Sequence, residues 1–211
     1  MGQYYNPLIL RKNWKLAKNP VIATLKCYDF NGNGAKLMEH SYAGNSFARS
    51  VEYLLANQFK GYPFVWCGDY YEPVTTNTGE HYLYSEGNRF IYKSDESNDP
   101  TKAYKKLKGS IPAMPEWKEG QRWNAYETIP YYRYLINYTK KQFCRMPMFN
   151  KKKWRVNPLP LLTCAGNGLG GGDYRRDDKR VGSWAFDCIG LTNSKKEIAG
   201  FEEIDGFFEM D

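Results

Sequence analysis

Residues 46–59, SFARSVEYLLANQF, carry the clearest helical pattern in this sequence and decide the fold class. Four apolar residues recur there at the spacing of one face of an α-helix: Phe47, Val51, Leu54 and Leu55. Asn45 comes just before them, and asparagine often caps the first turn of a helix. We predict one main amphipathic helix over about residues 46–58 that lies across a β-sheet.

The segments on both sides of this helix are typical of strands. Residues 4–10 (YYNPLIL) and 21–30 (VIATLKCYDF) bracket a polar turn and predict a hairpin. Residues 131–146 (YYRYLINYTKKQFCRM) predict a second hairpin, with its turn near 137–141. Further strands are expected at 62–71 (YPFVWCGDYY), 80–85 (EHYLYS), 88–93 (NRFIYK) and 180–192 (RVGSWAFDCIGLT).

Length and composition indicate one folded unit. The 211 residues, 42% of them hydrophobic and 17% aromatic, suffice for one substantial core. We expect a single α+β domain, residues 1–211, with a predominantly antiparallel twisted β-sheet, the one main helix packed on it and long irregular insertions. Residues 94–128 are expected to be such an insertion, because prolines interrupt them and they show no regular pattern.

The chain has no apolar run of the ~20 residues that a transmembrane helix needs, and its N-terminus lacks the pattern of a secretory signal. We therefore expect a cytoplasmic protein with no membrane partner. Its five cysteines form no C-x-x-C pair and stand among apolar neighbours. This pattern favours reduced, buried thiols over disulfides, a zinc site or a catalytic nucleophile.

The net charge of +7 is concentrated in one region. Residues 102–155 contain fourteen Lys or Arg and three Glu, interspersed with tyrosine and tryptophan, whereas the remainder of the chain is net acidic. Basic groups bind the phosphate backbone and aromatic rings stack on unpaired bases, so this combination suits nucleic acid. The alternative is a solvated basic face over an aromatic core.

Five glycines fall between residues 166 and 172, within LLTCAGNGLGGGDYRRDDKRVGSW (161–184). The match to G-x-G-x-x-G is not a dinucleotide site, because no helical stripe follows it, and no Gly-Lys-Ser/Thr closes a Walker loop. Two interpretations stay open: a turn whose N–H groups bind a phosphate, or a connection between two strands. On the first, the ligand-binding residues would be Asn167, Gly168, Gly170, Gly171, Asp173, Arg175 and Arg176.

Acidic residues and the two histidines are the candidates for catalysis. The histidines form the pairs Glu39-His40 and Glu80-His81, and each would need a partner from elsewhere in the fold. If the protein is an enzyme, the catalytic candidates are Glu39, His40, Asp69, Asp173 and Asp187. Converging carboxylates would suit Mg²⁺, whereas zinc is disfavoured by the lack of paired cysteines. The alternative is that these acids are hydrogen-bonded turn and edge residues with no cofactor.

Six motifs, taken in order, resemble an uncharacterised family of small proteins from bacteria and their phages, with relatives in fungi. They are MGQYY (1–5), KLMEHSYAGN (36–45), VWCGDY (65–70), LINYTKK (135–141), NPLPLLTCAGNGLGGGDY (157–174) and VGSWAFD (181–187). The resemblance implies no particular activity. It implies importance for Glu39, Trp66, Asp69, Asn137, Thr139, Lys140, Asn167, Gly168, Gly171, Asp173, Trp184 and Asp187, and it favours Glu39 over His40, because distant relatives carry a shorter KLMEHSY stretch without the histidine.

Three functions are compatible with these patterns. The first is binding of a phosphate-bearing ligand, a nucleotide or nucleic acid, by the glycine cluster, its arginines, Trp66, Asn137, Lys140 and the basic aromatic segment. The second is metal-assisted hydrolysis of phosphodiesters by the acids above. The third is a protein-interaction effector without catalytic activity, for which Trp117 and Trp123 would supply exposed aromatic anchors.

Overall fold

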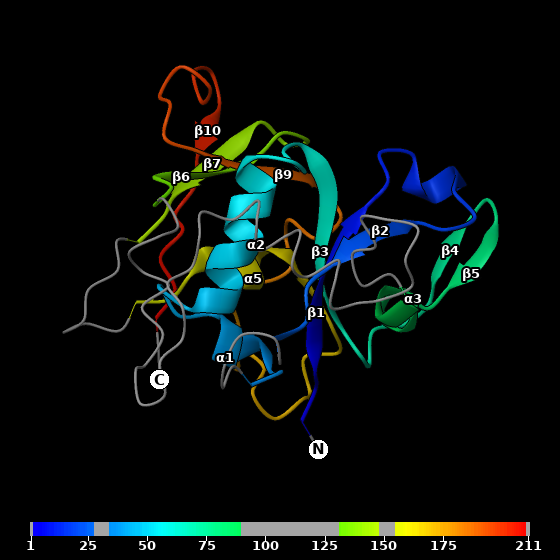
Figure 1. The fold of residues 1–211 in the computed structure, drawn as a ribbon. Coiled ribbons are helices and arrows are strands. Elements are labelled where there is room, and N and C mark those ends of the chain that lie inside the picture. Colours follow the sequence, from blue (N-terminus) through cyan, green and yellow to red (C-terminus); the bar gives the residue numbers. More distant parts are fainter. Residues whose placement is uncertain (1, 28–33, 90–130, 148–154, 210–211) are drawn as a thin grey trace, which may run out of the picture.

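The computed structural model describes residues 2–27, 34–89, 131–147 and 155–209. They form a mixed α+β fold around one large sheet with the strand order β10-β7-β6-β9-β3-β1-β2 (Figure 1). The pairings in this sheet are antiparallel except for β10 with β7 and for β8, which pairs parallel to β3. The predicted α+β class with a mostly antiparallel sheet is confirmed.

One half of the sheet is built on β1. This strand (Tyr5–Leu10) is buried along its whole length and lies between β2 (Val21–Thr24) and β3 (Tyr62–Gly68). A short 3-10 turn, η1 (Trp14–Leu16), lies between β1 and β2, so the first predicted hairpin is confirmed. The two-residue strand β8 (Cys164–Ala165) joins the end of β3, directly before the glycine cluster.

The other half of the sheet contains the second predicted hairpin. Its strands are β6 (Tyr134–Asn137) and β7 (Gln142–Arg145), and the turn falls where the sequence places it. The strand β9 (Cys188–Thr192) connects β6 to β3, and β10 (Glu202–Glu203) lies along β7. A separate hairpin is formed by β4 (Val74–Thr76) and β5 (Gly79–His81).

The main helix, α2 (Ser46–Ala56), confirms the amphipathic prediction. The Asn45 side chain caps it by accepting a hydrogen bond from the Ala48 amide at 2.9 Å. Its apolar face joins a buried cluster that includes Trp66 and Ile189 from the sheet, and Figure 1 shows α2 crossing the face of the sheet. Two shorter helices, α1 (Leu37–His40) and α5 (Pro158–Thr163), contribute Leu37 and the leucines of α5 to the same cluster.

Three predicted strands are wrong over part of their length. Residues 83–85 and 88–89, expected to belong to the strands 80–85 and 88–93, form helix α3 (Leu83–Arg89), whereas residues 80–81 do lie in β5 and 90–93 lie outside the described residues. Leu83 is buried there, and a methyl group on Gly87 would lie 2.4 Å from the Leu8 side chain, so this turn of helix packs closely on β1. The predicted strand at 180–192 begins only at Cys188, because Gly182 and Phe186 adopt left-handed backbone conformations (φ 72° and 69°) that interrupt extended structure.

Several expectations fall outside the described residues. The irregular insertion at 94–128, with Trp117 and Trp123, is one of them, as is most of the basic aromatic segment at 102–155. Within the described ranges, no helix combines the length and apolar character that crossing a bilayer requires. The cytoplasmic location stays a prediction.

Candidate functional site

The glycine-rich loop, residues 166–173, closes over the first residues of the chain. Gly2 and Gly171 form a parallel bridge. A methyl group on Gly170 would lie 2.3 Å from Cβ of Gln3, and one on Gly166 would lie 2.3 Å from the Tyr5 hydroxyl. Both distances are shorter than van der Waals contact allows, so the glycines at these positions permit the loop to approach the N-terminal strand.

Backbone amides in this loop bind oxygen atoms of the loop itself. The Gly170 amide donates to Oδ2 of Asp173 at 2.9 Å, and the Leu169 amide donates to Oδ1 of Asn167 at 3.0 Å. The Asp173 amide donates to the Gly170 carbonyl at 3.1 Å. An anion at these three groups would have to displace oxygen atoms that the loop already supplies.

Gln3 is the centre of the polar contacts beneath the loop, and it is completely buried. Its side-chain amide nitrogen lies 2.9 Å from the Tyr5 hydroxyl, 3.0 Å from Asp173 Oδ2 and 3.1 Å from Asn167 Oδ1, so its two hydrogens are shared among three acceptors, and its oxygen accepts from the Tyr70 amide at 3.2 Å. Burial, and then the Asp173 carboxylate, raise the pKa of Tyr5 far above its usual range. Sequence reasoning missed Gln3, although it lies within the MGQYY motif.

Only some of the acids predicted for catalysis lie near one another in the fold. Asp69 exchanges hydrogen bonds with Tyr4, since its Oδ1 accepts from the Tyr4 amide at 3.0 Å and its own amide donates to the Tyr4 carbonyl. Asp69 and Asp173 therefore both border residues 3–5. Glu39 lies on α1, which is joined to the loop by a hydrogen bond from the Met38 amide to the Gly172 carbonyl, and its carboxylate accepts from the Lys36 amide.

Asp187 lies in a different place. Its carbonyl accepts from the Phe64 amide, five residues before Asp69 along β3, which corresponds to roughly 16 Å of extended chain. Its carboxylate accepts from Asn137 Nδ2 at 2.8 Å and lies 3.6 Å from Lys140 Nζ. The predicted residues Asn137, Lys140 and Asp187 are thus close to one another at the β6–β7 turn, away from the glycine-rich loop. Thr139 joins them by accepting from the Cys188 amide.

No group of three or more His, Cys, Asp or Glu side chains in the described ranges is arranged to hold a metal ion. The acids instead accept protein hydrogen bonds, as described above for Glu39, Asp69, Asp173 and Asp187. Asp173 keeps one buried oxygen, Oδ1, without a hydrogen-bond partner among the described residues. The predicted role of these acids in catalysis stays a prediction.

Two of the three arginines that follow the loop form ion pairs with acidic residues. Arg175 is exposed, whereas Arg176 is paired with Glu209 and Arg180 with Asp178 and Asp205. An ion-paired guanidinium offers less to a phosphate than an unpaired one, because the ligand must replace the carboxylate.

His40 is a buried structural residue. Its Nδ1 accepts from Nε1 of Trp66 at 3.0 Å, so its Nε2 carries the proton and donates to the Gly34 carbonyl at 2.8 Å. Both side chains are completely buried, and Trp66 offers no exposed ring to a ligand. Burial lowers the pKa of His40 to about 4, because the charged imidazolium would lose its hydration.

His81, the other histidine, finds its partners nearby in the chain. Its Nε2 lies 3.0 Å from the Thr78 hydroxyl and its Nδ1 lies 2.8 Å from Glu86 Oε1. The order hydroxyl, imidazole and carboxylate is that of a catalytic triad. The Thr78 hydroxyl, however, donates to the Ala17 carbonyl at 3.1 Å, so its proton is not directed at the imidazole. The contacts join the β4–β5 hairpin to α3.

A buried polar cluster that sequence reasoning missed lies on the second face of α2. Arg49 and Glu52 are 1% and 3% exposed, with Arg49 Nε 3.6 Å from Glu52 Oε2. Asn157 donates to the other Glu52 oxygen at 2.6 Å, and the Arg49 guanidinium lies 3.7 Å from the centre of the Tyr131 ring. At 100° per residue Arg49 lies opposite the apolar stripe, where a helical pattern predicts solvent.

Tyr131 also borders a cavity of about 820 Å³, which we call the tyrosine groove. Its described lining consists of three tyrosines, three cations and three further residues: Tyr131, Tyr132, Tyr134, Arg133, Arg145, Lys195, Met146, Pro147 and Asn193. Asn193 links its own segment of the lining to the tyrosine segment. Its side chain accepts a hydrogen bond from the Arg133 amide and donates one to the Tyr131 carbonyl. This lining contains no acidic side chain.

Four of the five cysteines have the buried thiols that the sequence predicts. Cys27, Cys67, Cys144 and Cys164 are buried, and Cys188 is half-buried. Burial raises the pKa of Cys67 and of Cys164 to about 12, which keeps these thiols protonated at neutral pH.

The pKa shifts of His40 and Glu52 predict opposing effects of pH on stability. In the folded protein the His40 pKa is about 4, below the ordinary 6.5. The free energy of unfolding therefore decreases as pH falls from 6.5 towards 4, because the unfolded chain binds the proton more readily. Burial raises the Glu52 pKa to about 7 from 4.5, although Arg49 lowers it, so stability falls as pH rises from 4.5 to 7. Between pH 5 and 7 each effect is about 2 kcal/mol, and together they nearly cancel.

Urea unfolding at pH 5 and pH 7 separates the two groups. We expect the free energy of unfolding of Glu52→Gln to rise by about 2 kcal/mol between these pH values, and that of His40→Gln to fall by a similar amount. The wild-type protein should change much less than either variant. An equal pH dependence in all three proteins would contradict both assignments.

Comparison with protein-family models, with curated proteins and with solved structures found no match to this chain. The resemblance to the bacterial and phage family therefore stays a prediction, carried by the motifs alone.

Proposed function

We propose that the protein binds a phosphate-bearing ligand with unpaired bases, a single-stranded nucleic acid, in the tyrosine groove. The observation that carries this proposal is the lining of the groove, in which three tyrosines accompany three cations and no acid among the described residues. Cations attract the phosphates and aromatic rings stack on bases regardless of sequence.

The cations of the groove differ in their availability. Arg133 and Lys195 are exposed, and neither forms an ion pair within the described part of the chain. Arg145 is paired with Glu203, its Nε 2.7 Å from the carboxylate. Phosphate binding should therefore depend most on Arg133 and Lys195.

The tyrosine rings are held in place by the surrounding fold. Tyr134 is a β6 residue, only 8% exposed and packed on Phe143, so it supports the groove and leaves base stacking to Tyr131 and Tyr132. The Tyr132 hydroxyl accepts from Asn57 Nδ2 at 3.3 Å, and Arg49 covers one face of the Tyr131 ring. Rings that are fixed before binding lose little conformational entropy when a base stacks on them.

Salt dependence of oligonucleotide binding tests the proposal. For three phosphate contacts on a single strand, the slope of log K against log salt is expected to be about −2. Arg133→Ala combined with Lys195→Ala should weaken binding at low salt and reduce the slope by about 1.4. The measurement is fluorescence anisotropy with a labelled twelve-residue oligothymidylate between 50 and 200 mM salt, a range in which such contacts are measurable.

Arg175→Ala combined with Arg176→Ala removes the same charge from the glycine-rich loop and serves as the matched comparison. If this pair, rather than the groove pair, reduces affinity and slope, the phosphates bind at the loop. Absence of binding at 50 mM salt would overturn the proposed function. A cytoplasmic location and the resemblance to phage-associated proteins are compatible with this function and are proposed with it.

A further inference from the structure

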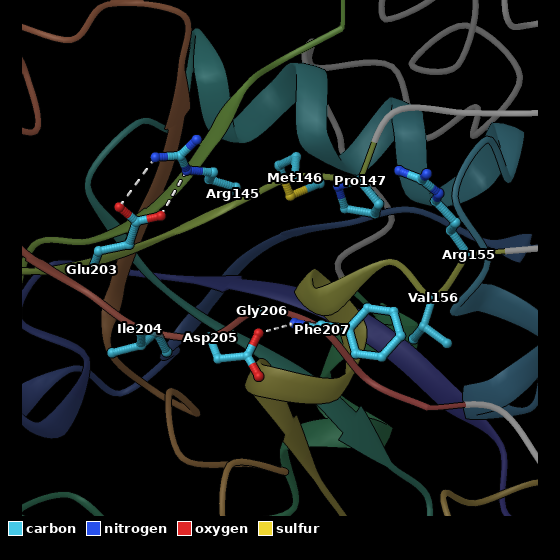
Figure 2. Close-up of a pocket in the computed structure, with 10 residues that line it drawn as sticks. All are labelled: Arg145, Met146, Pro147, Arg155, Val156, Glu203, Ile204, Asp205, Gly206 and Phe207. Atoms are coloured by element: carbon cyan, nitrogen blue, oxygen red, sulfur yellow. Dashed lines mark hydrogen bonds and ion pairs between the residues drawn. The ribbon is translucent and has the colours of Figure 1, made fainter.

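We propose that a second cavity, the Phe207 pocket, binds a nucleobase of the strand whose phosphates lie in the tyrosine groove. The inference rests on the proposed function and assigns a new subsite to it. The pocket has a volume of about 780 Å³, within the range of sites that enclose small molecules. Its lining is Arg145, Met146, Pro147, Arg155, Val156, Glu203, Ile204, Asp205, Gly206 and Phe207 (Figure 2).

The two cavities share a wall. Arg145, Met146 and Pro147 line both of them. These residues form the end of β7 and the chain just beyond it, so the two cavities adjoin along this segment. A strand that crosses the segment can thus keep its phosphates beside the cations of the groove and place a base in the pocket.

The surface of the pocket is mostly apolar. Met146, Pro147, Val156 and Ile204 contribute aliphatic atoms, and Phe207 contributes an aromatic ring that is 65% exposed. Figure 2 shows this ring beside Val156, with Arg155 at the same end of the pocket. A large exposed aromatic ring next to an apolar wall offers a stacking surface for a flat apolar group such as a base.

Both acids of the pocket are neutralised by the protein itself. Glu203 accepts from Nε of Arg145 at 2.7 Å and from its Nη2 at 3.5 Å (Figure 2). Asp205 accepts from the Phe207 amide at 2.9 Å through Oδ1 and from Arg180 at 3.0 Å through Oδ2. A nearby phosphate is therefore not faced by an unpaired carboxylate.

Arg155 remains as a cation at the edge of the pocket. It is exposed and forms no ion pair with a described residue. An apolar cavity with an aromatic ring and one available cation complements a base with its attached phosphate. The exposed Arg155 can pair with a phosphate of the strand, a contact that a purely apolar peptide does not supply, which favours the nucleic acid as the occupant.

The test compares an oligothymidylate of twelve residues with an oligomer of the same length whose residues are abasic, by fluorescence anisotropy at 50 mM salt. We expect wild-type protein to bind the oligothymidylate at least tenfold more tightly, since each base that stacks on an aromatic ring, in the groove or on Phe207, is worth about this factor. Phe207→Ala should reduce this preference about tenfold, the share of one stacked base, by weakening binding of the oligothymidylate while leaving binding of the abasic oligomer unchanged. An oligouridylate of equal length distinguishes RNA from DNA as the preferred strand.

Tyr82→Ala is the matched control, because Tyr82 is a similarly exposed aromatic residue (59%) between β5 and α3. It should leave both affinities unchanged. Phe207→Leu keeps an apolar side chain and should still lose most of the share of the preference that Phe207 contributes, which separates stacking from general hydrophobic contact. If Phe207→Ala leaves oligothymidylate binding intact, or weakens both oligomers equally, the base subsite is wrong while the groove stands. If wild-type protein binds neither oligomer, the proposed function itself fails.

Discussion

Replacing Gly170 with alanine is expected to lower the free energy of unfolding by about 3 kcal/mol or more. The added methyl group would lie 2.3 Å from Gln3 Cβ and 2.7 Å from the Gln3 backbone nitrogen. Neither atom is the end of a flexible side chain, so the loop or the N-terminal strand must shift. Such a shift would disturb the Asp173 and Asn167 contacts of Gln3, which is completely buried. Urea unfolding monitored by tryptophan fluorescence measures the loss.

Gly168→Ala is the control for this prediction. Gly168 has a left-handed backbone (φ 70°), but a methyl group there would meet no atom of a described residue within 4 Å. It should cost only the conformational penalty of about 1 kcal/mol. Equal losses at the two positions would mean that backbone conformation, and not close packing on Gln3, explains the glycines of the loop.

Replacing Glu52 with leucine is expected to destabilise the protein by about 3–5 kcal/mol. The substitution leaves the buried Arg49 guanidinium without its carboxylate and removes the acceptor of Asn157 Nδ2. The cost comes mainly from the uncompensated buried charge, since an ion pair in the interior gains little beyond what its own desolvation costs. Chemical denaturation at pH 8, above the Glu52 pKa of about 7 so that the group is mainly ionised, gives the change in the free energy of unfolding.

The double substitution Arg49→Met with Glu52→Leu forms a double-mutant cycle with the wild-type protein and the two single substitutions Arg49→Met and Glu52→Leu. Because it removes both charges, it should be more stable than Glu52→Leu alone by at least 1 kcal/mol. Part of the loss should remain, because methionine cannot reproduce the contact of the guanidinium with the Tyr131 ring. Additive losses in the cycle would show that Arg49 and Glu52 do not interact.

The helix and the hairpins could be predicted because their patterns are local. Phe47, Val51, Leu54 and Leu55 define one face of α2 within nine residues, and Asn45 caps it from the adjacent position. The β6–β7 hairpin likewise needs only contacts between neighbours in the chain, with Asn137 paired to Gln142. Helix α3 escaped prediction because Leu83 and Gly87 pack on β1, about 75 residues earlier, and this contact overrides the aromatic strand pattern.

The candidate site was predictable only in part, for a similar reason. The sequence by itself determined that the glycine cluster is not a dinucleotide fingerprint, because the absence of a helical stripe after it is a local property. Only the tertiary structure decided that the cluster packs on Gln3, that Asp187 lies apart from Asp173, and that Arg49 is buried. It also decided that Tyr131, Arg145 and Lys195 line one groove. Each of these facts depends on segments distant in sequence, whose approach no residue spacing encodes.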